Sequence, residues 1–176
     1  LIRHEQKFNW DVIVPLFFLV ASIGVVATLR VDIDFTGPAG LFASVNGLLG
    51  VLAGFYIASL AAIYTMNGPG LDDKMKGEPP ELRVKNKNTQ YTVELTRRAY
   101  LRYLFGYLAT VSIALFFFGI LMNVFYAPIR EALPESDHIV SCVSWLFGMI
   151  YVFFLANLTV NTLVGVYYLT ERIHRE

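Results

Sequence analysis

The sequence predicts an all-α membrane protein with four transmembrane helices per subunit, and three observations support this fold class. Only 16% of the 176 residues are charged, whereas soluble proteins carry about 25%. Hydrophobic residues make up 56% of the chain, and the mean hydropathy is +0.53. Four stretches contain neither a charged residue nor a histidine: 12–29, 35–71, 103–129 and 139–170. A helix that crosses a bilayer needs about 20 apolar residues, so each stretch accommodates one span.

The four spans are expected over residues 12–29, 41–66, 96–127 and 139–170. Pro15 lies in the first turn of the first span, where its missing N–H costs little. The sequence Asn67-Gly-Pro-Gly ends the second span, and Pro128 follows the third. Short acidic turns, 30–40 and 128–138, follow the first and third spans. We expect residues 1–176 to form a single four-helix transmembrane domain.

The segment 67–96 is the only sizeable polar stretch, and it is expected to be a cytoplasmic loop within that domain. Leu82 and Val84 alternate with polar residues, and Tyr91 and Val93 repeat the alternation. Alternation with period two is typical of a strand, so the loop is predicted to contain a short β-hairpin.

Lysine and arginine are distributed unevenly between the two sides of the predicted spans. Twelve lie before the first span, in 67–102 or after the fourth span, and two lie in the acidic turns. Cytoplasmic loops carry the excess of basic residues in membrane proteins. Both termini and the 67–96 loop are therefore expected to be cytoplasmic, and the short turns to face outward.

The second span carries small residues at a spacing of four, which indicates a helix-packing stripe. A Gly-x-x-x-Gly pattern lets membrane helices approach closely. The stripe would pack helices either inside one subunit or between subunits, and the motif is compatible with both alternatives. Its members are Asn46, Gly50, Gly54, Ala58 and Ala62.

The fourth span carries amides that hydrocarbon does not solvate. Asn157, Asn161 and Gly165 are four residues apart, and Thr162 lies beside them. Buried amides in a membrane face protein or water. They would either hydrogen-bond between helices or line a pore, where a symmetric oligomer would turn each asparagine into a ring. These four residues are the pore-lining candidates.

Eight basic residues gather in and after the 67–96 loop, on the face predicted to be cytoplasmic. One interpretation is that they set topology and contact anionic membrane lipids. The other is a site for a nucleotide, an oligonucleotide or an acidic partner protein. The residues are Lys74, Lys76, Arg83, Lys85, Lys87, Arg97, Arg98 and Arg102.

The sequence contains no feature that indicates catalysis, so the protein is expected not to be an enzyme. Apart from Arg97, Arg98 and Arg102 at the start of the third span, the predicted spans carry no acid, base or histidine for ion coupling or proton relay. Neither a phosphate-binding glycine motif nor a metal-ligand spacing of His and Cys is present. No cofactor and no metal are therefore expected.

The run from Leu95 to Ala109 (LTRRAYLRYLFGYLA) resembles a recurrent segment of small bacterial membrane proteins. The layout of the whole chain is similar to the four-span membrane components of two-gene antiphage systems, the Hailong-type channel effectors and the Kiwa-type membrane sensors. This resemblance implies a multi-pass protein of the bacterial inner (plasma) membrane. It also implies a homo-oligomer, expected to be a tetramer, that a cytoplasmic partner or the partner's product controls.

Three functions follow as hypotheses. The first is a homo-oligomeric channel, gated from the cytoplasm by a ligand or partner protein bound at 67–102, with Asn157 and Asn161 along the path. The second is a non-conducting sensor or scaffold that recruits a cytoplasmic effector through the basic face. A third is an assembly factor for another membrane complex.

Overall fold

The computed structural model describes residues 2–3, 12–29, 34–37, 40–66, 72–73, 81–86, 89–132 and 137–170. Side-chain positions are described for 12–25, 28, 34–37, 40–66, 72–73, 95–131 and 141–169. Within these residues the chain forms four helices, in agreement with the all-α prediction for the apolar segments. They are α1 (Val14–Leu29), α2 (Leu41–Thr65), α3 (Arg97–Ala132) and α4 (Asp137–Thr170).

The third helix extends further than the sequence indicated. The end was predicted before Pro128, but α3 continues through Pro128 to Ala132, and α4 begins at Asp137. An interior proline removes one backbone hydrogen bond, and the good helix formers Arg130, Glu131 and Ala132 continue the helix after it. The predicted turn 128–138 is therefore helical at every residue that the structure describes.

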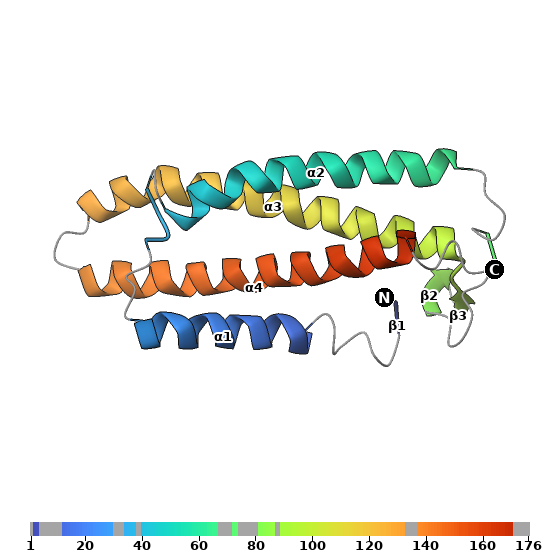
Figure 1. Cartoon of the computed structure of the whole chain (residues 1–176), viewed down its shortest axis with the longest axis horizontal. Helices are drawn as coiled ribbons and strands as arrows, with labels where there is room; N and C mark the ends of the chain where they lie inside the picture. The colour runs from blue at the N-terminus through green and yellow to red at the C-terminus, as the bar shows by residue number, and fades with distance from the viewer. Residues whose placement is uncertain are drawn as a thin grey trace.

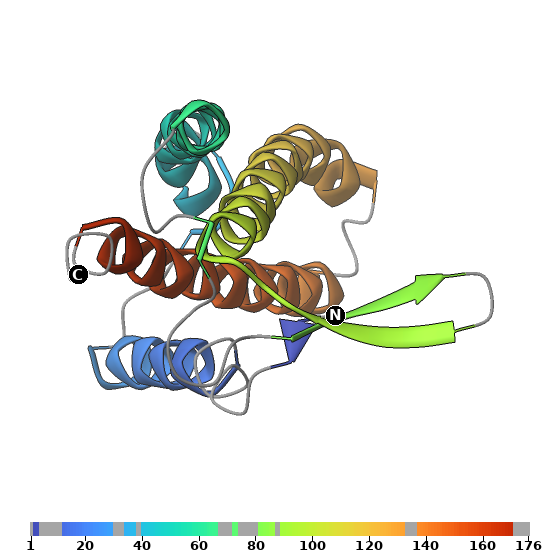
Figure 2. The same ribbon diagram turned by 90° about the vertical axis from the view of Figure 1, so that its right-hand side faces the viewer.

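The helix α4 lies in the middle of the molecule. Figures 1 and 2 show α2 and α3 on one side of it and α1 on the other. The most extensive helix contact is between α2 and α3, and α1 packs along α4. The compact core is therefore built by α2, α3 and α4, with α1 attached at the periphery.

The antiparallel pair α2 and α3 packs through a regular seam. The buried residues Phe42, Leu49, Tyr56 and Ile63 recur every seven positions along α2. Residues buried along α3 alternate four and three apart: Leu101, Phe105, Leu108, Ser112, Leu115 and Gly119. Such spacing keeps a seam facing its partner along a pair of helices that cross at a small angle.

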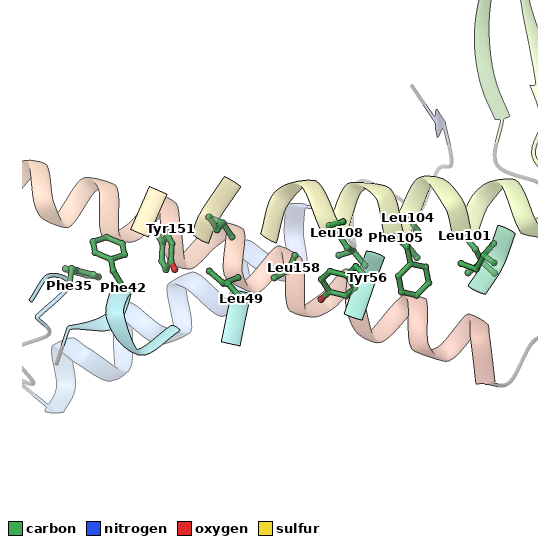
Figure 3. Close-up of a cluster of buried hydrophobic side chains, with 13 residues drawn as sticks. Phe35, Phe42, Leu49, Tyr56, Leu101, Leu104, Phe105, Leu108, Tyr151 and Leu158 are labelled. Atoms are coloured by element: carbon green, nitrogen blue, oxygen red, sulfur yellow. The ribbon is translucent and has the colours of Figure 1, made fainter. Parts of the chain in front are cut away.

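The contact of α4 with α2 depends on large side chains. Tyr151 of α4 meets Phe42 of α2 with ring centroids 4.8 Å apart, and Tyr56 of α2 contacts Thr162 of α4. Both tyrosines are completely buried. Figure 3 shows these aromatic side chains in a row with the leucines of the α2–α3 seam.

Three described helices are long and apolar enough to cross a membrane: Leu41–Thr65, Arg97–Glu131 and Ser141–Leu169. The shorter apolar helix, Val14–Val25, belongs to α1. Large hydrophobic side chains face outward, among them Phe17, Val51 and Leu163, which are 68%, 70% and 65% exposed. An apolar exterior of this extent fits a hydrocarbon environment and not water.

A small antiparallel sheet lies at one end of the helices, which we call the hairpin end (Figure 2). The strands β2 (Glu81–Asn86) and β3 (Thr89–Glu94) pair with Leu82 opposite Val93 and Val84 opposite Tyr91. These are the residues whose alternation predicts the hairpin. The two-residue strand β1 (Ile2–Arg3) pairs with β2. We call the opposite end, where residues 34–37 lie, the Phe35 end.

Candidate functional site

The two asparagines of α4 form a buried hydrogen-bonded pair. Asn157 and Asn161 are only 4% and 7% exposed. The Asn161 amide donates to the Asn157 carbonyl oxygen at 3.0 Å and to the Asn157 Oδ1 at 3.3 Å. The Tyr107 hydroxyl of α3 donates to the same Oδ1 at 2.8 Å. The Asn157 Oδ1 and the Asn161 amide nitrogen therefore have their partners in α3 and α4 of a single subunit.

The other two pore-lining candidates also face the core of this chain. The Thr162 hydroxyl donates to the carbonyl of Leu158 at 2.6 Å and shares a hydrogen bond with the Tyr56 hydroxyl. A Cβ at Gly165 would lie 3.3 Å from atoms of both Leu104 and Phe105. Gly165 thus lets α4 lie close to α3.

The structure places the four candidates around α4 and not along one open face. Residues four apart on an α-helix are rotated by about 40° relative to one another, since a helix has 3.6 residues per turn. Asn157 therefore contacts Tyr107, whereas Gly165 meets the α2–α3 seam. The contacts agree with the interhelical alternative for these residues, and pore lining in an oligomer stays a prediction.

The predicted packing stripe rotates away from the α2–α3 seam for the same reason. At its start, Asn46 contacts Gly119, and a Cβ at Gly50 would lie 3.8 Å from Phe116. A Cβ at Gly54 would meet nothing within 4 Å. Ala58 and Ala62 are exposed. Only the first two residues therefore pack inside this subunit, and contact of the other three with a second subunit stays a prediction.

Three buried polar atoms have no hydrogen-bond partner among the described residues: Asn46 Oδ1, the Ser112 hydroxyl and the Tyr151 hydroxyl. They come from α2, α3 and α4, respectively. Ser112 and Tyr151 are completely buried. In the sequence, Asn46 stands out as part of the small-residue stripe, whereas Ser112 and Tyr151 do not, because a lone serine or tyrosine in an apolar run is a common feature.

An aromatic cluster closes the Phe35 end of the core. The Phe35 ring lies so close to Gly148 that a Cβ at that glycine would clash with it. Phe35 also contacts Trp145 and Phe42, with ring centroids 5.1 and 6.2 Å apart. Two residues on, the Gly37 N–H donates to Asn123 Oδ1 at 3.0 Å, and Gly37 has a φ of 95°, which favours glycine.

At the hairpin end, Arg98 of α3 hydrogen-bonds both to Asp72, which precedes α3, and to the last turn of α2. Its guanidinium donates to both carboxylate oxygens of Asp72, at 2.7 and 3.0 Å, and to the carbonyl of Ile63 in the last turn of α2 at 3.3 Å. The Arg98 side chain is 14% exposed and that of Asp72 is 73% exposed. Arg98 is thus occupied within the chain.

The remaining predicted basic residues are placed unevenly. Arg102 lies over the ring of Tyr64, 5.2 Å from its centroid, and Arg97 is partly exposed at the start of α3. Arg83 and Lys85 lie on β2, for which the structure describes the backbone. Lys74, Lys76 and Lys87 lie outside the described residues.

Among the described residues, no group of three or more His, Cys, Asp and Glu side chains is placed to hold a metal ion. Cys142 lies exposed on α4 and is a free thiol.

The fold and these contacts define a helical protein of membrane-protein-like composition. No protein-family model, curated protein or solved structure matches this chain. The likeness to antiphage components therefore rests on the sequence segment and layout described above.

Proposed function

We propose that this protein is a non-conducting membrane sensor or scaffold that recruits a cytoplasmic effector through its basic hairpin end. The observation that carries the proposal is the internal use of the polar groups in α4. Asn157, Asn161 and Thr162 hydrogen-bond inside one subunit, so they are not free to line a water-filled path. This favours the second sequence-based hypothesis over the channel.

The proposed topology has four spans, with both chain ends and the hairpin in the cytoplasm of a bacterium. The helix α1 has 16 residues and is about 24 Å long at 1.5 Å per residue. The hydrocarbon core is about 30 Å thick, so α1 spans it with local thinning of the bilayer or with the flanking residues included. Packing along α4 supports its insertion beside the other helices.

The surface proposed for recruitment is the β2–β3 hairpin. Figure 2 shows it extending sideways beyond the helices, and β2 carries Arg83 and Lys85. The sequence of the loop adds further lysines. An acidic segment of a partner protein, or an anionic nucleotide product of that partner, would pair with Arg83, Lys85 and Lys87, which stand in the sequence between Glu81 and Glu94.

Reconstitution into liposomes tests the proposal. We expect the purified protein, inserted and oligomeric, to show no ion flux with or without cytoplasmic extract. In cells, a cross-linked partner should be lost on R83E/K85E and retained on Arg130→Glu, which reverses a charge at the Phe35 end. Ion flux, or a partner retained equally by both variants, would contradict the scaffold.

A gated channel is the second candidate, and the unpartnered polar atoms of the core favour it, because a hydrated interior would satisfy them. For this candidate, replacing Asn157 and Asn161 together by Leu should abolish flux while assembly is preserved. Unchanged flux in that variant would show that neither asparagine lines the conduction path.

Self-association is proposed to use the exposed part of the small-residue stripe. We expect Gly54→Leu to reduce the oligomer seen by cross-linking while subunit stability is unchanged, because nothing lies within 4 Å of a Cβ at that position. Gly119→Leu is the contrasting variant, since it displaces Asn46 and should destabilise the subunit itself. An intact oligomer in Gly54→Leu would exclude this surface.

A further inference from the structure

The two ends of the hairpin segment meet at the start of α3. The Arg97 N–H donates to the Asp73 carbonyl at 3.2 Å, and this bond closes a loop of chain that contains β2 and β3. On the α3 side, β3 ends at Glu94 and α3 begins at Arg97. The hairpin is therefore attached to the helices at one place, on one side by the continuous chain and on the other by the contacts of residues 72–73.

The α3 side of this junction is fixed by burial and by a helix cap. Leu95 is 4% exposed. The Thr96 hydroxyl accepts from the Ala99 N–H at 3.3 Å, which is the bond of a helix N-cap. On the other side, the Asp72 side chain that pairs with Arg98 is 73% exposed. Because an exposed ion pair adds little stability and is screened by salt, the attachment at Asp72 is the one that opens first.

The guanidinium of Arg98 uses two edges for two different partners. Its Nη1 donates to the Ile63 carbonyl at 3.3 Å, in the last turn of α2, where carbonyls lack a partner within the helix. Its Nε and Nη2 donate to the two carboxylate oxygens of Asp72, at 2.7 and 3.0 Å. The bond to Ile63 therefore keeps Arg98 at the end of α2 even when Asp72 leaves.

The edge formed by Nε and Nη2 fits any acidic group that offers two oxygens. A planar guanidinium binds a carboxylate in this bidentate arrangement, whichever chain supplies it. The Arg98 side chain is only 14% exposed, whereas the carboxylate that it binds is largely exposed. A second carboxylate can therefore approach from the solvent side, and Arg98 requires one when Asp72 leaves, because a mostly buried charge without a partner is costly.

We propose that the Arg98–Asp72 ion pair is an intramolecular latch, in which Asp72 occupies the position that an acidic side chain of a partner protein takes on Arg98. While the latch is closed, residues 72–73 are held at the ends of α2 and α3, and Arg98 is withheld from the partner. Replacement of Asp72 releases one side of the hairpin and adds Arg98 to the recruiting surface. This inference rests on the proposed function, since the partner is the one that the hairpin end recruits.

Amide exchange tests the latch in the absence of any partner. The probe is the Arg97 N–H of the ¹⁵N-arginine-labelled full chain in nanodiscs, assigned by its loss in Arg97→Lys. We expect Asp72→Asn to make exchange of this N–H with water about threefold to fivefold faster, because residues 72–73 lose their ion pair. Asp72→Glu keeps the carboxylate and should restore the slow exchange.

Asp73→Asn is the matched control for amide exchange. It removes a neighbouring carboxylate, but Asp73 contacts Arg97 through its backbone carbonyl, so the exchange should not change. Equal exchange in Asp72→Asn and in the unmodified protein would overturn the latch.

Binding of an acidic peptide tests the position on Arg98. The probe is a fluorescent hexaglutamate peptide, added to the full chain in nanodiscs of zwitterionic lipid, with the affinity measured by anisotropy. Asp72→Asn should strengthen binding by about threefold. Asp73→Asn, which removes the same charge from the same segment, should strengthen it clearly less. In an Arg98→Gln background, Asp72→Asn should give no gain. Equal gains in the two single variants, or a gain that persists without Arg98, would overturn the proposal.

The variant R83E/K85E separates this inference from the proposed function. It reverses two charges on β2 and should lose the peptide. Peptide binding that R83E/K85E leaves unchanged would contradict recruitment by the hairpin, whereas the difference between Asp72→Asn and Asp73→Asn would still decide the latch. No peptide binding by the unmodified protein or by Asp72→Asn would overturn both the recruiting surface and the role of Arg98 in it.

Discussion

The two contacts of α2, with α3 and with α4, are built on different principles. The α2–α3 seam sets the seven-residue repeat of α2 against a regularly spaced row of buried residues of α3, and it is the most extensive contact between two helices. The α2–α4 contact uses the large side chains of Phe42, Tyr56 and Tyr151, and it includes polar groups. The first contact is the most extensive between two helices, whereas the second joins α2 to α4 through a few large side chains, and α4 also packs on α1 and α3.

The largest effect is expected in the seam. Leu108→Ala removes a completely buried side chain and should lower the free energy of unfolding by about 2–5 kcal/mol. Leu163→Ala, at a position that is 65% exposed, should change it by about 0.5 kcal/mol or less. Equilibrium unfolding in detergent measures both, and equal effects would show that the seam is not the main contact.

A smaller effect on stability is expected at Gly148 of α4, over which the Phe35 ring lies. Gly148→Ala forces the Phe35 ring to move and should destabilise the protein by about 1–3 kcal/mol. Gly106→Ala is the control, because its Cβ meets nothing within 4 Å and alanine favours the helix by up to about 1 kcal/mol. Thermal unfolding compares the two, and a stable Gly148→Ala would mean that Phe35 does not occupy this place.

The polar part of the α2–α4 contact should contribute less. Tyr56→Phe removes the hydrogen bond to Thr162 while it keeps the ring, and we expect a loss of about 1 kcal/mol. Ser59→Ala, whose hydroxyl bonds only the Phe55 carbonyl of its own helix, should have a negligible effect. A double-mutant cycle with Thr162→Val measures the Tyr56–Thr162 pair, and additive losses would exclude the bond.

The smallest effect is expected at the hairpin end. Arg98→Ala should cost about 1 kcal/mol or less, since its partner Asp72 is largely exposed to solvent. The loss should shrink at high salt, where exposed charges are screened. Arg97→Ala is the neighbouring control. Unfolding at low and at high salt measures the difference, and a salt-independent loss would assign the effect of Arg98 to packing or to its bond with the Ile63 carbonyl.

The sequence was sufficient to predict the apolar helices because charge-free runs and hydropathy report directly on them. The α2–α3 seam was also present in the sequence, as the repeat Phe42, Leu49, Tyr56 and Ile63. The prediction of the packing face was based instead on the small residues spaced four apart. Because that spacing rotates by about 40° at each step, it marks no single face over four turns.

The candidate site was predicted only in part. Asn157 and Asn161 were recognised because amides are costly in hydrocarbon, but their partner Tyr107 was not, since which helices lie side by side depends on tertiary packing. Arg98 was assigned to a binding face, whereas Asp72, twenty-six residues earlier, pairs with it. The contact of Phe35 with Gly148 could not be predicted from the sequence, because a phenylalanine near a predicted turn is common and indicates no particular partner.

Cysteine accessibility tests most directly whether the amides of α4 lie inside one subunit. Cys142 of the unmodified protein, labelled after the liposomes are dissolved in a denaturing detergent, is the positive control for a water-soluble thiol reagent. Asn161→Cys in a Cys142→Ser background should remain unmodified, because position 161 is buried against its own chain. Rapid modification of the Asn161→Cys variant that depends on cytoplasmic extract would contradict the internal role and place this position on a water-filled path.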